Sequence, residues 1–305
     1  MMMNQDDARH MDGLGTEQTS DPDLELNGLD TVALVRAMER REDRVRDAVR
    51  AVTPQIAKAV DGIVARLREG GRLVYVGAGT SGRLGVLDAS EIPPTFGTDP
   101  SLVVGLIAGG RDALVKSAES VEDHRQIGAR DVQDIGLNER DCLVGIAASG
   151  RTPYVIGALD HANGVGALTI ALACNVRAEI SDHADIAIEV PVGPEIVSGS
   201  TRLGAGTATK MVLNMLSTIT MIRMGKTYRT LMVDVKATNE KLVARAVRIV
   251  RDVTGVDEER ARQTLEQADW SAKLAIVMIE KDCDAARAET ILEQHNGFLA
   301  KVIDG

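Results

Sequence analysis

The sequence predicts an α/β fold built on a parallel sheet, followed by a small helical bundle at the C-terminal end. Three observations support this prediction. Short apolar runs typical of buried strands alternate with longer amphipathic segments between residues 73 and 223. Glycine-rich or serine-rich turns follow the first and third of these runs. Beyond Gly255 the chain contains only short, charged, helix-forming segments, at 257–267, 271–280 and 284–293, which are typical of a three-helix bundle.

The first apolar run, Leu73–Val76, leads directly into a glycine-rich turn at residues 77–82. A helical pattern follows this turn, and we expect it to end at Pro93-Pro94 because proline breaks helical hydrogen bonding. Glycines allow a ligand to approach the backbone, and the free N–H groups of a helix start favour an anion. The turn therefore predicts a phosphate-bearing ligand, with Thr80 and Ser81 as additional donors.

Two familiar nucleotide motifs overlap this turn. Gly77, Gly79 and Gly82 fit the dinucleotide pattern G-x-G-x-x-G, but that pattern needs an acidic residue about 20 positions later. Residues 101–106 contain none. The triphosphate loop requires Lys and Ser/Thr after its last glycine, where this chain has Arg83-Leu84. Both nucleotide interpretations are therefore disfavoured.

The third apolar run repeats the first turn. A second strand is expected at 102–107 and a third at 142–147. Ser149-Gly150-Arg151 then repeats the triplet of residues 81–83, and Pro153 suits the first turn of a helix. Two such units place both turns at one edge of a parallel sheet, with a ligand at the switch point between them.

Further elements complete the predicted architecture. Helices are expected at 30–50 and 56–67, ahead of the first strand, and from residue 112 to about 127. Two more strands are expected at 166–173 and 186–190.

A third turn rich in glycine and hydroxyl groups, residues 199–207, precedes a helix expected at 207–223. Ser200 and Thr201 either only cap this helix or also contact a ligand.

Composition narrows the classes of partner. The 305-residue chain has a net charge of −10, and aromatic residues make up 2%. Negative charge repels a polyanion, and few rings are available for base stacking, so we expect no nucleic-acid partner. Five cations near predicted turns could concentrate positive charge around a phosphate: Arg83, Arg151, Arg202, Lys210 and Lys226.

The spacing of the cysteines and the length of the apolar runs indicate the cellular compartment of the protein. Cys142, Cys174 and Cys283 are widely separated and have the spacing of neither a zinc site nor a disulfide framework. We therefore expect reduced thiols, a cytoplasmic protein and no metal. The N-terminal region lacks the pattern of a signal peptide. The longest apolar stretch, 211–224, falls short of the roughly 20 residues that span a membrane.

Five collinear motifs carry a family resemblance: GAGTSGRLGVLDASEIPPTFG (77–97), IAGG (107–110), GIAASGRTPYVIGAL (145–159), GSTRLGAGTATK (199–210) and LMVDVKATNEKL (231–242). In this arrangement they resemble the N-acetylmuramic acid 6-phosphate etherase family of the sugar isomerase (SIS) domain superfamily. The resemblance implies a three-layer α/β/α SIS domain over 24–245 and a ubiquitin-associated-like bundle over 246–305. It also implies a homodimer with its sites at the subunit interface. The polar and acidic composition of residues 1–23 predicts a flexible arm. At Thr19 and Ser20 the chain departs from relatives, which tend to carry Arg and Asn there.

The resemblance further implies a reaction. The ether between D-lactate and C3 of the sugar would leave by elimination, and water would then add at C3, without a metal or redox cofactor. Such chemistry needs a base for the C2 proton and an acid for the lactate oxygen. The family pattern assigns the acid to Glu91 and the base to Glu122, with Glu119 and Asp123 as rivals of the base. We expect Glu91 to lie at the helix end before Pro93-Pro94, in an otherwise apolar stretch of the sequence.

The resemblance assigns the phosphate to hydroxyl groups of the glycine-flanked turns: Thr80, Ser81, Ser149 and Thr152, with Ser200 or Thr201 contributing. Two alternative functions remain open from the sequence. An aldose-ketose isomerase would also remove a C2 proton but keep the C3 substituent. A non-catalytic phosphosugar sensor, like the related glucokinase regulatory protein, would keep the phosphate turns and need no carboxylate pair.

Overall fold

The computed structural model describes residues 14–19, 25–116, 119–235 and 239–305. The chain divides into two compact units. The first comprises Met1–Ala89 with Ser101–Leu216, and the second comprises Ser90–Pro100 with Ser217–Gly305. The domain boundaries expected from the sequence stay predictions.

The first unit is built on one five-stranded sheet, in which every pair of neighbouring strands is parallel. The strand order is β2-β1-β3-β4-β5. The strands are β1 (Leu73–Gly77), β2 (Val103–Ile107), β3 (Cys142–Ala147), β4 (Leu168–Ala173) and β5 (Ile186–Glu189). The chain turns to opposite sides after β1 and β3, so the switch point lies between these two central strands.

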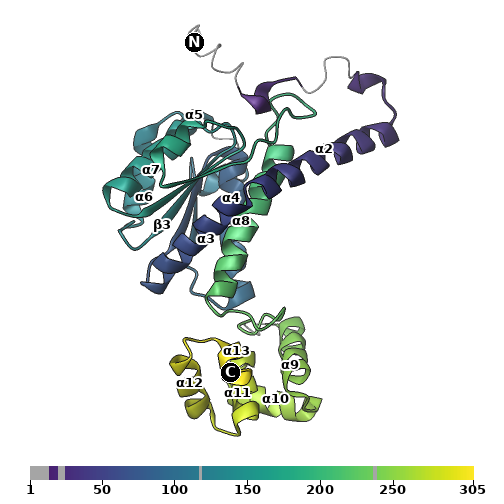
Figure 1. Cartoon of the computed structure of the whole chain (residues 1–305), viewed down its shortest axis with the longest axis vertical. Helices are drawn as coiled ribbons and strands as arrows, with labels where there is room; N and C mark the ends of the chain where they lie inside the picture. Colours follow the sequence, from purple (N-terminus) through teal and green to yellow (C-terminus); the bar gives the residue numbers. More distant parts are fainter. Residues whose placement is uncertain (1–13, 20–24, 117–118, 236–238) are drawn as a thin grey trace. The chain divides into compact units, whose positions relative to one another are not determined.

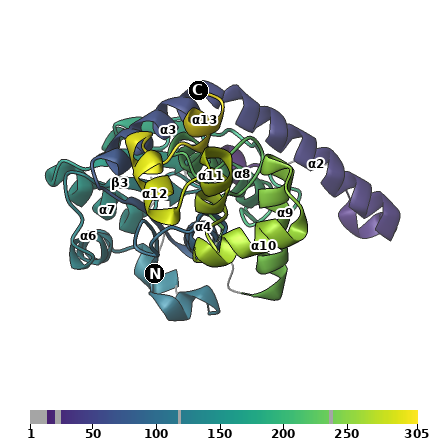
Figure 2. The same cartoon turned by 90° about the horizontal axis from the view of Figure 1, so that it is seen from below.

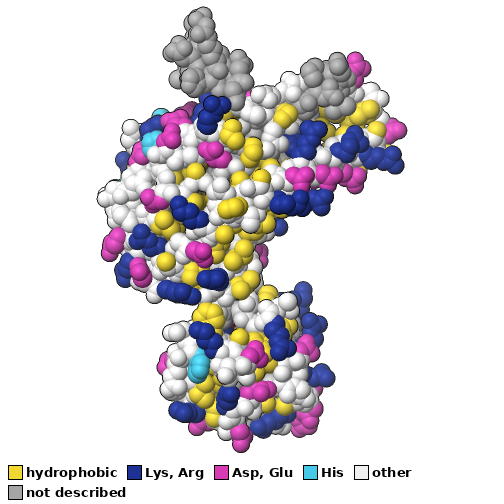
Figure 3. Space-filling view, in the orientation of Figure 1, with side chains coloured by type: hydrophobic (Ala, Val, Ile, Leu, Met, Phe, Trp, Pro, Cys, Tyr) yellow, Lys and Arg dark blue, Asp and Glu magenta, His cyan; other side chains and the backbone are white. Residues whose placement is uncertain are grey.

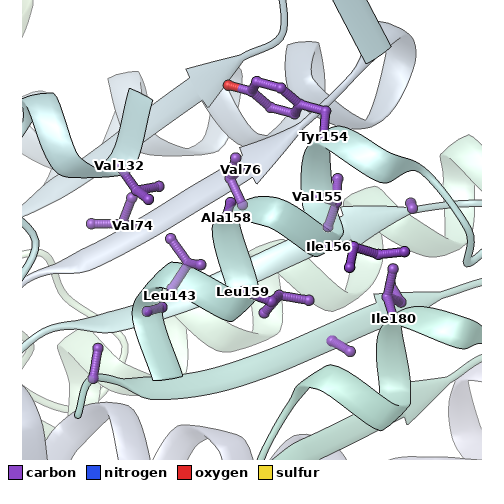
Figure 4. Close-up of a cluster of buried hydrophobic side chains, with 14 of the residues drawn as sticks. Val74, Val76, Val132, Leu143, Tyr154, Val155, Ile156, Ala158, Leu159 and Ile180 are labelled. Atoms are coloured by element: carbon purple, nitrogen blue, oxygen red, sulfur yellow. The ribbon is translucent and has the colours of Figure 1, made fainter. Parts of the chain in front are cut away.

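Helices α6 (Arg125–Asp134) and α7 (Pro153–Gly164) cover one face of the sheet. Val74, Val76 and Leu143 project from the strands into a fully buried cluster with side chains of α7 (Figure 4). Burial of this kind contributes about 25 cal/mol for each Å² of apolar surface. This cluster therefore fixes α7, and with it the turn that precedes α7, against the sheet.

Helices α3 (Thr53–Arg68) and α4 (Gly79–Phe96) lie on the opposite face (Figures 1 and 2). A Cβ atom on Gly85 of α4 would lie 3.0 Å from the Cβ of Tyr75, and one on Gly62 of α3 would lie 2.7 Å from Leu168. Glycine therefore permits both helices to approach the strands closely. The predicted three-layer α/β/α architecture is confirmed.

Helix α2 (Thr31–Ala51) precedes α3 and is strongly charged (Figure 3). Asp30 caps its N-terminus, because Oδ1 of Asp30 accepts a 2.8 Å hydrogen bond from the N–H of Ala33. Val32, Val35 and Met38 follow one another at helical spacing and are exposed in this chain.

A short stretch of the predicted arm is described. Gly15–Glu17 forms a 3₁₀ helix, η1, and Thr16 is fully buried. The N–H of Thr16 donates to Oδ1 of Asn175 at 3.2 Å, and Nδ2 of Asn175 donates to Oγ1 of Thr16 at 3.0 Å. This stretch therefore packs beside the end of β4. Residues 1–13 and 20–23 of the arm lie outside the described residues.

The structure corrects two predicted helices. Helix α4 does not end at Pro93-Pro94 but continues to Phe96. Proline has a helical φ, but it lacks an N–H and its ring crowds the carbonyl four residues earlier. The N–H of Gly97 nevertheless donates to the carbonyl of Pro93 at 2.9 Å, so helical hydrogen bonding resumes beyond the prolines. The helix expected from residue 112 to about 127 is also wrong. This segment forms the 3₁₀ helix η3 (Arg111–Leu114), one turn of α5 (Glu119–Glu122) and the start of α6, with an extended His124 between the last two.

In its described residues, the second unit has five helices after the loop that follows α8 (Gly204–Arg223): α9 (Glu240–Thr254), α10 (Glu258–Gln267), α11 (Ala272–Lys281), α12 (Ala285–Gln294) and α13 (Leu299–Ile303). Helix α11 contacts the other four (Figure 2). The three helices expected beyond Gly255 are confirmed as α10, α11 and α12, and side chains of Asp257, Ser271 and Asp284 cap them.

The three cysteines are free thiols. Cys142 and Cys174 are buried in the sheet unit, and Cys283 is half-buried in the helical bundle. Burial raises the pKa of Cys142 far above its ordinary value and that of Cys174 to about 12. Among the described residues, no helix has the length and apolar character that crossing a membrane requires.

Candidate active site

The glycine turn after β1 brings the start of α4 directly onto the end of the strand. A Cβ on Gly82 would lie 2.6 Å from the carbonyl oxygen of Gly77, and a Cβ on Gly77 would lie 2.8 Å from the nitrogen of Gly82. Only glycine fits at both positions. Thr80 and Ser81 therefore lie in the first turn of α4, where main-chain N–H groups favour an anion.

The turn after β3 lies at the same edge of the sheet. Gly77 pairs with Ile146 in the parallel register, so both turns follow neighbouring strand ends. Gly150 has a φ of +79°, and a Cβ there would lie 2.4 Å from that of Ala178. The half-buried Ser149 accepts a 3.3 Å hydrogen bond at Oγ from the N–H of Arg151. The prediction that the two Ser-Gly-Arg turns lie side by side at one sheet edge is confirmed.

Thr152 ends this second turn. It is half-buried and immediately precedes Pro153, the first residue of α7. The predicted helix start at Pro153 is confirmed. The hydroxyl of Thr152 is thus placed at a helix N-terminus, as are those of Thr80 and Ser81 in the first turn.

The third turn lies against the first. A Cβ on Gly206, in the first turn of α8, would lie 3.7 Å from the methyl carbon of Thr80 and 3.6 Å from the carbonyl oxygen of Thr201. Ser200 and Thr201 are half-buried in this turn. Within the described part of the chain, five of the six predicted phosphate hydroxyls make no hydrogen bond to another residue: those of Thr80, Ser81, Thr152, Ser200 and Thr201.

The cap of α8 is a residue that the sequence analysis did not single out. Glu195 is fully buried, and its carboxylate accepts from the N–H groups of Gly204 and Ala205 at 3.0 and 2.8 Å. This ionic acceptor satisfies the first donors of the helix. Helix α8 accordingly begins at Gly204 rather than at the expected Thr207.

Arg41 of α2 supports the same carboxylate and was likewise not foreseen. Its Nε donates to the carbonyl of Pro194 at 2.7 Å, and its Nη2 lies 3.9 Å from Oε2 of Glu195. Arg41 is 7% exposed, and burial lowers the pKa of its guanidinium. These partners are about 150 residues apart in the sequence, and no local motif marks the pairing.

The cations expected near phosphate turns have different surroundings. Arg83 is half-buried and donates to the backbone carbonyls of Leu114 and Lys116 at 3.2 and 3.3 Å. Arg151 is half-buried, whereas Arg202 and Lys210 are exposed.

Lys226 lies in the second unit, where its Nζ is 3.7 Å from Oδ2 of Asp234. The buried Lys273 of α11 also donates to the Asp234 carboxylate, and it donates to the carbonyl of Gly225 at 2.9 Å. Burial lowers the pKa of Lys273. Asp234 thus compensates two cations within the helical unit, which gives Lys226 a structural partner.

The predicted base, Glu122, is the last residue of the single turn α5 and is half-buried. Glu122 also has an interaction partner in the chain. Its rival Asp123 is exposed, and the side chain of Glu119 lies outside the described part of the chain.

The predicted acid, Glu91, lies within α4, which continues for five residues beyond it. The expectation of a helix-ending position is wrong, because α4 passes through both prolines. The Glu91 side chain is exposed in this chain. One turn earlier, the buried Asp88 accepts from the hydroxyl of Tyr75 at 3.0 Å and from Nδ2 of Asn214 at 2.6 Å.

A cavity of about 670 Å³ opens beside β2. It is lined by main-chain and apolar atoms together with Arg111, Asp131 and Asp134. Val121, the neighbour of Glu122, is also part of its wall. Among the residues that the structure describes, no three His, Cys, Asp or Glu side chains gather as they would around a metal ion.

Three family descriptions match the chain. Residues 55–163 match the glucokinase regulatory protein N-terminal SIS domain, and residues 125–221 match the SIS domain. Residues 229–274 match the C-terminal lid domain of glucokinase regulatory protein.

Solved structures resemble the chain more distantly. A phosphoheptose isomerase from Francisella tularensis is 21% identical, with a TM-score of 0.48, over 62% of this chain and 100% of that one. The phosphoheptose isomerase GmhA from Neisseria gonorrhoeae is 20% identical, with a TM-score of 0.49, over 62% of this chain and 98% of that one.

Curated relatives match over almost the whole chain. N-acetylmuramic acid 6-phosphate etherase from Aliivibrio fischeri (strain MJ11) is 51% identical over 95% of this chain and 97% of its own length. The protein of the same name from Vibrio campbellii is 54% identical over 92% of this chain and 91% of its own length. N-acetylmuramic acid 6-phosphate etherase 1 from Bacillus licheniformis is 48% identical over 96% of this chain and 97% of its own length. The chain therefore belongs to the N-acetylmuramic acid 6-phosphate etherase family.

Proposed function

We propose that the chain is an enzyme that cleaves the D-lactyl ether of N-acetylmuramic acid 6-phosphate and releases N-acetylglucosamine 6-phosphate and D-lactate. The observation that carries this proposal is identity of about one half, over more than nine-tenths of the chain, to proteins named for this etherase. Such a reaction serves the recycling of cell-wall sugars. The relatives favour it over the isomerase and the sensor that the sequence alone left open.

The phosphate of the substrate is held by the three hydroxyl-rich turns. Thr80 and Ser81 follow β1, Ser149 and Thr152 follow β3, and Ser200 or Thr201 completes the set before α8. Two features support this arrangement. The first two turns lie at one edge of the sheet, at the switch point where α/β folds bind ligands, and the third turn lies against Thr80 of the first. The N-terminus of α4 and the hydroxyls beside it supply donors suited to an anion.

The chemical step needs two proton transfers. Glu122, as the carboxylate, takes the C2 proton of the open-chain aldehyde, and the electron pair of that C–H bond becomes an enolate. The enolate collapses to a C2–C3 double bond as the C3–O bond breaks, and Glu91 gives its proton to the lactate oxygen. Water then adds at C3 and a proton returns to C2, so the sequence balances without an oxidant or reductant.

The working form of the enzyme is a cytoplasmic homodimer whose sites lie at the subunit interface. The exposed apolar residues Val32, Val35 and Met38 on α2 support association with a second copy, because burying them would remove apolar surface from water. Light scattering on the purified chain measures the oligomeric state directly, and a monomer at micromolar concentration would exclude this part of the proposal.

The function is tested by incubating the purified chain with N-acetylmuramic acid 6-phosphate and assaying D-lactate and the sugar product. The expected result is stoichiometric release of D-lactate and N-acetylglucosamine 6-phosphate, with one solvent oxygen at C3 when the reaction is run in ¹⁸O-water. Isomerised sugar phosphate without lactate would identify an isomerase instead. Tight binding of the sugar phosphate without any turnover would identify a sensor.

A further inference from the structure

The guanidinium of Arg83 joins two segments that carry predicted site residues. Arg83 lies in the second turn of α4, three residues after Thr80, so the two residues are neighbours on the helix surface. Its Nε donates to the carbonyl of Leu114 at 3.2 Å, and its Nη2 donates to the carbonyl of Lys116 at 3.3 Å. The planar guanidinium, with its rigid set of donors, therefore spans two carbonyl groups of one loop.

The segment that Arg83 holds has little other support. Val115 is 83% exposed and Lys116 is exposed, and both of their N–H groups donate locally, to Asp112. Within the described residues, the hydrogen bonds that link residues 114–116 to a distant part of the chain both come from Arg83. The segment leads within six residues to Glu122.

We propose that Arg83 is a positioning residue that couples the phosphate turn after β1 to the placement of Glu122. The proposal rests on the proposed function, in which Thr80 and Ser81 hold phosphate and Glu122 takes the C2 proton. Bound phosphate fixes the start of α4. Arg83 lies on this helix and fixes residues 114–116 through its two hydrogen bonds, and these residues in turn position the base. Binding energy from a non-reacting group is thereby used at the reacting carbon.

This role differs from that of a phosphate ligand. A ligand would point its donors at the anion, whereas Nε and Nη2 of Arg83 are engaged by main-chain oxygens. Loss of a ligand raises KM, because ground state and transition state lose the same contact. Loss of a positioning residue lowers the rate of proton abstraction, because a displacement of about 1 Å at the base can cost about 100-fold.

The kinetic test uses Arg83→Lys and Arg83→Ala, with Arg125→Gln as the control. Arg125 also has a side-chain partner, but its exposed ion pair with Glu179 joins α6 to the segment after β4. We expect both Arg83 variants to slow exchange of the C2 proton in heavy water about 10- to 100-fold. KM and inhibition by inorganic phosphate should change less than about 3-fold, and added guanidinium should partly restore Arg83→Ala. Arg125→Gln should match the parent chain.

A second measurement does not depend on turnover. Amide hydrogen exchange followed by mass spectrometry reports the stability of the segment around residues 110–124 in the parent chain and in both kinds of variant. We expect faster exchange there in Arg83→Ala than in the parent chain or in Arg125→Gln. Unchanged amide exchange, or a large rise in KM with C2 exchange intact, would overturn the proposal. Absence of lactate release by the parent chain would instead overturn the proposed function, and the amide result would still decide whether Arg83 stabilises the loop at residues 114–116.

Discussion

The side-chain amide of Asn214 donates a 2.6 Å hydrogen bond to Oδ1 of Asp88 and thereby joins α8 to α4. The other oxygen of Asp88 accepts from the hydroxyl of Tyr75 in β1 at 3.0 Å. One buried carboxylate thus connects a central strand with α4 and α8, at whose N-terminal ends predicted phosphate hydroxyls lie. These hydrogen bonds tie α4 to β1 and to α8.

Asp88→Ala is expected to destabilise the chain by about 2 to 3 kcal/mol, because it leaves the Tyr75 hydroxyl and the Asn214 amide without their buried acceptor. Urea unfolding measures this change. Asp88→Asn keeps one acceptor oxygen and should cost less than Asp88→Ala. Equal stability of the Ala variant and the parent chain would show that the network is dispensable.

Glu91→Gln is expected to abolish lactate release by at least about 100-fold while the C2 proton still exchanges with heavy water, since the general acid acts after proton abstraction. Glu122→Gln should stop both reactions. Proton NMR of the C2 position and an enzymatic lactate assay separate the two steps. If the C2 proton still exchanges with heavy water in the Glu122→Gln variant but not in the Asp123→Asn variant, Asp123 rather than Glu122 is the base.

Ser81→Ala is expected to raise KM about 10-fold with a smaller effect on kcat, because a hydrogen bond to a charged phosphate contributes about 1.5 kcal/mol or more in both ground and transition states. The inhibition constant of inorganic phosphate should weaken in parallel. Thr218→Ala removes an exposed hydroxyl from α8 and serves as the matched control. A fall in kcat at constant KM would place Ser81 at the reacting carbons instead.

Asp141 predicts how stability depends on pH. It is 1% exposed, its Oδ2 lies 2.6 Å from Nη2 of Arg72, and it accepts from the N–H groups of Arg72 and Asn138. Burial alone would raise its pKa, but the hydrogen bonds from Arg72 and Asn138 bring the pKa below the ordinary value. The folded pKa lies below the unfolded one, so the stabilisation is complete above about pH 4 to 5 and is lost as the pH falls through the folded value.

Asp141→Asn should therefore cost about 3 kcal/mol at pH 7, because Arg72 loses its buried partner. The difference between variant and parent should shrink as the pH falls below about 4. Urea unfolding at several pH values measures both effects. A difference that stays constant down to pH 3 would contradict the lowered pKa.

The strands could be predicted closely from the sequence because each is a short apolar run between turns. Cys142–Ala147 forms β3 with the expected bounds, and Leu73–Gly77 exceeds the expected run by one residue. The turns after these strands were predictable for a similar reason, since close approach requires glycine at Gly77 and Gly82.

Contacts between distant segments could not be predicted from local patterns. Arg41 and Glu195 meet across more than 150 residues, and a charged residue in a helix otherwise indicates only a solvated face. The position of Arg83 beside a predicted phosphate turn suggested that it binds the anion. Its guanidinium instead donates to the carbonyls of Leu114 and Lys116. The helix end predicted at Pro93-Pro94 was wrong for a different reason. Proline weakens a helix, but tertiary packing can maintain it, and α4 continues to Phe96.

The burial of Cys142 and Cys174 leaves Cys283 as the sulfhydryl that modifying reagents reach most readily. Thiolates rather than thiols react, and the two enclosed groups resist ionisation at neutral pH. A maleimide dye should therefore attach at the junction between α11 and α12, and the helical bundle would acquire a fluorescent reporter without any mutation.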